Sequence, residues 1–98
     1  MLYQSTRDSA HKKYTAAEVI KMGLAPDGGL FLPTEIPALT KEDFDALCGM
    51  TYPERAAFIL GKFLTDYDPA TLLSDCKMAY REERFPGGAA PLHKMADG

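Results

Sequence analysis

The residues best suited to bind a ligand lie close to the N-terminus, where the sequence reads Ser5-Thr6-Arg7. Two hydroxyls followed by a guanidinium offer several hydrogen-bond donors, and a guanidinium binds phosphate or carboxylate groups in a bidentate manner. The pattern predicts an anion clamp in which Ser5, Thr6 and Arg7 contact a substrate. The same residues also fit a strand edge with a surface arginine, and spacing alone favours that simpler interpretation.

A second candidate is the stretch GLAPDGGLFLP at residues 23–33, in which Pro26-Asp27-Gly28-Gly29 has the composition of a turn. Its glycines would let backbone amides approach a phosphate. Phosphate-binding loops, however, follow a strand and open a helix, whereas this turn precedes the apolar run Leu30–Leu32. We therefore interpret the stretch as a helix stop, a turn and a strand.

No other residues combine into a catalytic pattern. Two histidines have no cysteine, serine or carboxylate at a spacing that would indicate a catalytic pair. Two pairs of neighbouring carboxylates would point in different directions on a helix. These residues are His11, His93, Glu42, Asp43, Glu82 and Glu83. No lysine stands in an apolar context that would lower its pKa for Schiff-base chemistry. The sequence thus predicts no catalytic residue, no cofactor-binding residue and no metal ligand.

The composition is that of one soluble globular domain, with 98 residues, 46% of them hydrophobic, and a net charge of −3. That balance lacks the basic face typical of nucleic-acid-binding proteins, and no apolar run has the length of a signal peptide or a membrane span. Cys48 and Cys76 match no metal spacing, so we expect two buried, reduced thiols. These features predict a cytoplasmic protein that binds neither nucleic acid nor membranes.

Capping residues and the spacing of apolar side chains predict four helices, over residues 15–22, 40–48, 51–64 and 68–80. Each begins at a threonine or aspartate, and three carry an acidic residue at the position of a capping box. The apolar stripes of the last three helices are Phe44, Leu47 and Cys48; then Ala56, Ile59, Leu60, Phe63 and Leu64; then Leu72, Leu73, Cys76 and Ala79. We interpret Arg81–Arg84 as the solvated end of the last helix.

Strands are predicted at Leu2–Thr6 and Leu30–Leu32, with a third at Ala90–Met95 as a further candidate. The fold class is therefore α+β, a mostly helical small domain with two or three short strands. Residues 87 and 88 are glycines, so we expect residues 1–86 to form the domain and residues 87–98 to be a linker and the start of a following domain. On this interpretation the natural chain continues beyond Gly98.

Four segments taken in order resemble one known family. They are YQSTR at residues 3–7, GLAPDGGLFLP at residues 23–33, and YPERAAFILGKFL at residues 52–64, followed by FPGGAAPLHKM at residues 85–95. This ordered set resembles the N-terminal region of the threonine synthases, over essentially the whole chain. No single segment is decisive, and the order of the set gives the resemblance its specificity.

The resemblance implies an enzyme that converts O-phospho-L-homoserine and water to L-threonine and phosphate. Such enzymes use pyridoxal 5′-phosphate, held on a lysine in a motif like His-Gly-Pro-Thr-x-Ala-Phe-Lys-Asp, which these 98 residues lack. The resemblance therefore implies a non-catalytic N-terminal domain that packs on a downstream catalytic domain of the same chain. It also implies that this chain alone is inactive and does not bind the cofactor productively.

Two other functions fit the residues. The amphipathic helix expected at residues 51–64 would also suit a stand-alone helical interaction module that docks a partner. A threonine-synthase-like protein acting on another phosphorylated amino acid would share the same N-terminal region, because substrate specificity lies with the cofactor pocket.

Overall fold

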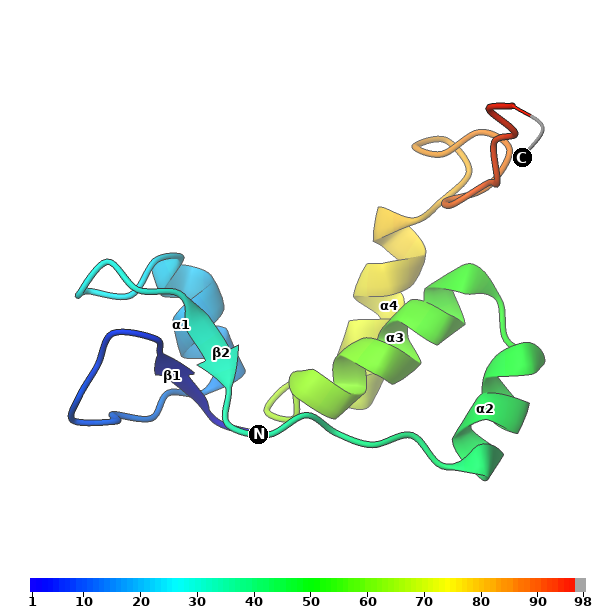
Figure 1. Cartoon of the computed structure of the whole chain (residues 1–98). Helices are drawn as coiled ribbons and strands as arrows, with labels where there is room; N and C mark the ends of the chain where they lie inside the picture. The colour runs from blue at the N-terminus through cyan, green and yellow to red at the C-terminus, as the bar shows by residue number, and fades with distance from the viewer. Residues whose placement is uncertain (97–98) are drawn as a thin grey trace.

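The computed structural model describes residues 1–96 and consists of two halves joined near the N-terminus (Figure 1). The first, here called the sheet half, contains two short strands and one helix. The second, the helical half, contains three helices. In chain order the elements are β1 (Tyr3–Ser5), α1 (Ala16–Met22), β2 (Phe31–Pro33), α2 (Lys41–Cys48), α3 (Tyr52–Phe63) and α4 (Pro69–Ala79). The predicted α+β class, mostly helical with short strands, is confirmed.

The sheet half is built around β1, which is hydrogen-bonded on both edges. On one edge it pairs antiparallel with β2, in the register Tyr3 opposite Pro33 and Ser5 opposite Phe31. On the other edge Tyr3 and Tyr14 exchange two backbone hydrogen bonds, each 2.9 Å long. The residue that leads into α1 is therefore tied directly to β1, which fixes the path of the intervening loop.

Helix starts follow the predicted caps because threonine and aspartate oxygens accept the amide hydrogens that a first turn leaves unpaired. Thr15 and Thr40 both form complete capping boxes, with Glu18 and Asp43 respectively. Asp68 caps α4, and Pro69 follows in the first turn, where its missing N–H costs nothing. Gly23 ends α1 with φ of 75° and ψ of −101°, a positive φ that glycine adopts readily.

The helical half rests on the pairing of α3 with α4, which run side by side in Figure 1. Leu72 and Cys76 of α4 are buried in this contact. Tyr52 and Tyr80 close one end of the pair, with ring centroids 5.0 Å apart in an edge-to-face arrangement. Helix α2 is attached mainly through polar contacts, of which the strongest is the bond from Arg55 Nε to the Leu47 carbonyl at 2.7 Å.

The two halves meet where β1 and α1 reach the end of α3. The hydroxyl of Tyr3 donates to the Phe63 carbonyl at 2.7 Å, and the backbone amide of Ala17 donates to Asp66 Oδ2 at 3.0 Å. The buried side chains around this junction are Tyr3, Ala16 and Val19, with Leu64 and Tyr67 of the helical half among the partly buried residues packed against them. Burial and the charge of Asp66 both raise the pKa of the Tyr3 hydroxyl, which therefore stays protonated as a donor.

Several local predictions are wrong. Residues 90–95 form no strand, and the chain turns after α4, so that Arg81–Arg84 lie outside the helix. Cys76 is buried as expected, but Cys48 is exposed, since no residue of α2 is buried and only Leu47 of its apolar stripe is half-buried. The capping box at Thr51 is half formed, since Glu54 accepts from the Thr51 hydroxyl instead of its amide.

The arrangement is open for a chain of this size. The Cα radius of gyration is 16.6 Å, whereas a compact domain of 100 residues has a radius of about 13 Å. The accessible surface is 7304 Å², compared with about 5,500 Å² expected for a compact monomer of this mass. Among residues 1–96, no helix has the length and apolar character needed to cross a bilayer.

Replacing Tyr3 by Phe tests the junction. The substitution removes the bond to Phe63 and leaves that carbonyl without its partner, so we expect the free energy of unfolding to fall by about 1 kcal/mol. Urea denaturation, followed by circular dichroism, measures this free energy of unfolding. Tyr67→Phe is the matched control, because the described residues give the Tyr67 hydroxyl no hydrogen bond. Equal effects of the two substitutions would show that the Tyr3 bond does not hold the halves together.

Candidate functional site

The residues predicted to form an anion clamp lie at the end of β1, against the turn at residues 25–29. The Ser5 hydroxyl donates to Asp27 Oδ1 at 2.7 Å and accepts the Arg7 amide at 3.3 Å. Ser5 is also buried, with 5% of its surface exposed. Its hydrogen-bonding capacity is thus largely used inside the chain, which gives Ser5 a structural role in holding the turn against the strand.

The turn itself has the form that its sequence predicts. Ala25 accepts the Gly28 amide at 2.9 Å, and the Ala25 amide donates to the Gly29 carbonyl at 3.1 Å. Pro26 supplies the fixed φ at the second turn position, and Gly28 adopts a φ of 81°. The interpretation of the stretch at residues 23–33 as helix stop, turn and strand is confirmed.

Asp27 is the charged residue at the contact between β1 and the turn at residues 25–29, a contact here called the interlock. Its Oδ1 accepts from both the Ser5 hydroxyl and the Gly29 amide. These two hydrogen bonds, followed by the charge of Arg7, lower the pKa of the Asp27 carboxyl. A β-carbon at Gly28 would lie 3.1 Å from Arg7 Nη1, so the guanidinium lies over the turn. The positive charge of Arg7 is therefore partly balanced by the ionised Asp27.

Ser5 and Thr6 line a hollow of about 250 Å³, and Arg7 does not. The lining residues are Gln4, Ser5, Thr6, Lys13, Leu32, Pro33 and Thr34. The structure brings two of the three predicted residues to one cavity and directs the third toward the turn. Three polar residues of this hollow, Gln4, Lys13 and Thr34, were missed from the sequence, and the last two come from outside β1. Only the backbone pairing of β1 with residues on both of its edges brings them there.

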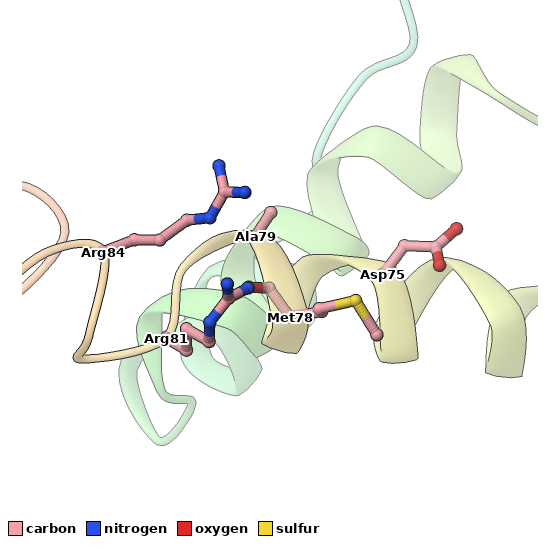
Figure 2. A pocket seen from close by; sticks show the side chains of 5 residues that line it. All are labelled: Asp75, Met78, Ala79, Arg81 and Arg84. Atoms are coloured by element: carbon pink, nitrogen blue, oxygen red, sulfur yellow. The ribbon is translucent and has the colours of Figure 1, made fainter.

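Two further hollows offer less polar chemistry. One of about 410 Å³ lies between α3 and α4 and is lined by Tyr52, Arg55, Ala56, Ile59, Leu60 and Tyr80. Another of about 220 Å³ lies at the end of α4 (Figure 2). There the side chains of Asp75 and Arg84 lie on opposite sides and do not converge, while Arg81 Nη1 donates to the Met78 carbonyl at 2.5 Å.

Neither of the two larger hollows described above fits the Schiff-base form of pyridoxal phosphate. That cofactor needs a lysine for its Schiff base together with donors for its phosphate. The apolar hollow between α3 and α4 contains no lysine, and the only lysine of the 250 Å³ hollow, Lys13, is exposed. Within residues 1–96, no group of three histidine, cysteine or acidic side chains is placed to hold a metal ion.

Substitution of Gly29 tests the fit of the turn against β1. A β-carbon there would overlap Ser5 Oγ and lie 3.0 Å from both Asp27 Oδ1 and Thr6 Oγ1. We expect Gly29→Ala to lower the free energy of unfolding by roughly 1–3 kcal/mol. Gly61→Ala is the control, because its β-carbon would meet nothing closer than Leu72 Cδ2 at 4.0 Å. That helical substitution is expected to stabilise by about 0.5–1 kcal/mol. If both substitutions stabilise, the interlock is absent in solution.

The lowered pKa of Asp27 predicts a pH dependence of stability. Its contribution is fully present above the ordinary value of 3.8 and is lost as the pH falls through the lower value of the folded state. The difference in urea midpoint between the wild type and Asp27→Asn should therefore be constant at neutral pH and shrink below pH 3.8. Glu35→Gln, at an exposed carboxylate, serves as the control. A difference that is independent of pH would contradict this role.

Comparison with known proteins identifies relatives of the chain. The family described as "Threonine synthase N terminus" matches residues 2–80. Threonine synthase of Methylobacillus glycogenes is 32% identical over 99% of this chain and 22% of its own length. Human "Threonine synthase-like 1" is 36% identical over 82% of this chain and 11% of its own length. The chain therefore spans about a fifth or less of these relatives.

The fold also matches a solved structure. The crystal structure of threonine synthase from Escherichia coli superposes with a TM-score of 0.77 at 23% identity, covering 93% of this chain and 21% of that one. The arrangement of helices and strands is thus shared well beyond what the sequence identity alone would suggest. Since the family match extends over residues 2–80, this chain belongs to the threonine synthase N-terminal domain family.

Proposed function

We propose that this chain is the non-catalytic N-terminal domain of a threonine synthase. The complete enzyme would convert O-phospho-L-homoserine and water to L-threonine and phosphate in the cytoplasm. The match of the family over residues 2–80 carries the proposal. The relatives are several times longer than this chain, so the catalytic activity belongs to the complete protein.

The domain's own contribution is to dock on the catalytic part of the same polypeptide. Leu24, Leu30 and Ile36 in the sheet half are 64%, 60% and 77% exposed. Phe44 of α2 is 56% exposed. Large apolar side chains so poorly covered, on a chain with excess surface, mark contacts to a further body. We propose that this body is the downstream catalytic domain.

Pyridoxal phosphate, when bound to the complete enzyme, would supply the electron sink for the reaction. No residue of this chain is assigned to it, because neither of the two larger hollows fits its Schiff-base form. The lysine and the phosphate donors would lie in the catalytic domain. Ser5, Thr6 and Arg7 remain proposed contacts to the substrate phosphate. Arg7→Ala in the complete enzyme is expected to lower kcat/KM, and an unchanged value would remove Arg7 from that role.

Expression of three proteins tests the assignment. They are the complete protein, this chain alone, and the complete protein lacking residues 1–86. Phosphate release from O-phospho-L-homoserine is expected only from the complete protein, because the deletion exposes the docking surface of the catalytic domain. This chain alone should retain no pyridoxal phosphate after gel filtration. Stoichiometric cofactor on the isolated chain, or full activity without residues 1–86, would refute the proposal.

A second candidate has one observation in its favour. The relatives include threonine-synthase-like proteins of human and mouse, which are 36% and 37% identical over 82% and 86% of this chain. The complete protein would then be a phospho-lyase with another O-phosphorylated amino acid as its substrate. Phosphate release from such compounds, with none from O-phospho-L-homoserine, would favour this candidate over the first.

A further inference from the structure

We propose that the 250 Å³ hollow beside β1 binds a phosphate-class anion, either free phosphate or the phosphate of a phosphomonoester. The hollow lies on the strand that connects the two halves of the molecule, and its polar lining combines hydroxyls with one ammonium group. The cation of this site is Lys13, which the sequence alone did not indicate, and not Arg7.

The lining residues offer hydrogen-bond donors that nothing else uses. Thr6 Oγ1 accepts the Leu30 amide at 3.1 Å, which leaves its own hydroxyl proton available. The described residues give neither the Thr34 hydroxyl nor the Lys13 ammonium group a hydrogen bond or an ion pair. These three residues are exposed and their donors can reach a bound ion, and a phosphate dianion accepts through several oxygens at once.

The charge around the hollow favours an anion. No carboxylate is among the lining residues. The ionised Asp27 is hydrogen-bonded to the lining residue Ser5, but its charge is partly balanced by Arg7, and Asp8 accepts the amides of Ala10 and Lys12. Residues 1–21 carry four basic and two acidic side chains, whereas the rest of the chain carries seven and twelve. With Asp27 included, residues 1–33 carry four basic and three acidic side chains, so the sheet half keeps a small excess of positive charge in an otherwise acidic chain.

The backbone holds the lining in place without a ligand. Lys13 precedes Tyr14, whose two hydrogen bonds to Tyr3 fix it on one edge of β1. Thr34 lies on the opposite edge, where its amide donates to the Leu2 carbonyl at 2.9 Å. Two short, rigid attachments therefore place a cation and a hydroxyl on either side of the strand. The backbone positions of Lys13 and Thr34 are thus fixed before an ion binds, so that only their side chains have to be ordered.

This site does not depend on the catalytic assignment, because all of its residues lie within this chain. Lys13 and Lys12 provide an internal comparison, since both are exposed lysines in one loop. The Lys12 ammonium lies over the Tyr14 ring, 5.1 Å from its centroid, and does not line the hollow. A reagent that acetylates lysines reports on each of them separately by mass spectrometry of the complete protein.

The experiment measures acetylation of Lys13 and Lys12 in increasing inorganic phosphate, with sodium chloride at matched ionic strength. Saturable protection of Lys13 but not of Lys12 is expected. The Thr34→Val variant should raise the midpoint of protection about tenfold, because it removes one charge-assisted hydrogen bond without changing the shape of the side chain. Equal protection of both lysines, or an unchanged midpoint in Thr34→Val, would overturn the proposal.

A parallel titration identifies the source of the phosphate. O-phospho-L-homoserine protecting Lys13 at lower concentration than inorganic phosphate would assign the site to a phosphomonoester. Equal concentrations would assign it to the free ion. Protection of Lys13 by either compound, in a complete protein without lyase activity, would support the anion site and contradict the proposed enzyme activity. The two proposals can therefore be refuted independently.

Discussion

The hydrogen bond from Tyr3 to the Phe63 carbonyl is the contact on which the arrangement of this chain depends. Tyr3 has neighbours on three sides. Tyr14 lies on one edge of its strand, Pro33 lies on the other edge, and its hydroxyl contacts the end of α3. The backbone of this one residue therefore contributes to the sheet and the entry to α1, and its side chain to the position of the helical half. It is also one of only six buried hydrophobic residues in the described chain.

So small a core explains why the fold is open. Within residues 1–96, no large side chain is completely buried, and polar contacts hold α2 to α3. A chain that keeps much of its apolar surface exposed gains little from hydrophobic burial on its own. The proposed function accounts for the small hydrophobic core, because a domain that docks on a larger body buries further apolar surface there.

The local elements were predictable because their signals are local. Threonine caps, an aspartate followed by proline, and the turn Pro26-Asp27-Gly28 each act over three or four residues, and the structure shows all of them. Burial was less predictable. Phe44 and Cys48 have helical spacing typical of a core, but spacing cannot say whether the covering surface belongs to the same domain.

In the candidate site, too, spacing along the chain did not reveal which residues lie together. The sequence indicated Ser5 and Thr6 because they are adjacent, and it added Arg7 for the same reason. Arg7 lies in the turn after β1, where the charge of Asp27 attracts its guanidinium, while antiparallel pairing brings Lys13 and Thr34 from distant positions. Residues that converge through pairing leave no signal in spacing along the chain.

Hydrogen exchange measured on this chain alone and within the complete protein tests the central claim most directly, that the domain completes its burial on a catalytic body. The account predicts that amides of residues 20–36 exchange at least about tenfold more slowly in the complete protein, because docking covers the exposed apolar side chains and suppresses local opening. Equal exchange in the two proteins would contradict it and would leave the chain as an independent module.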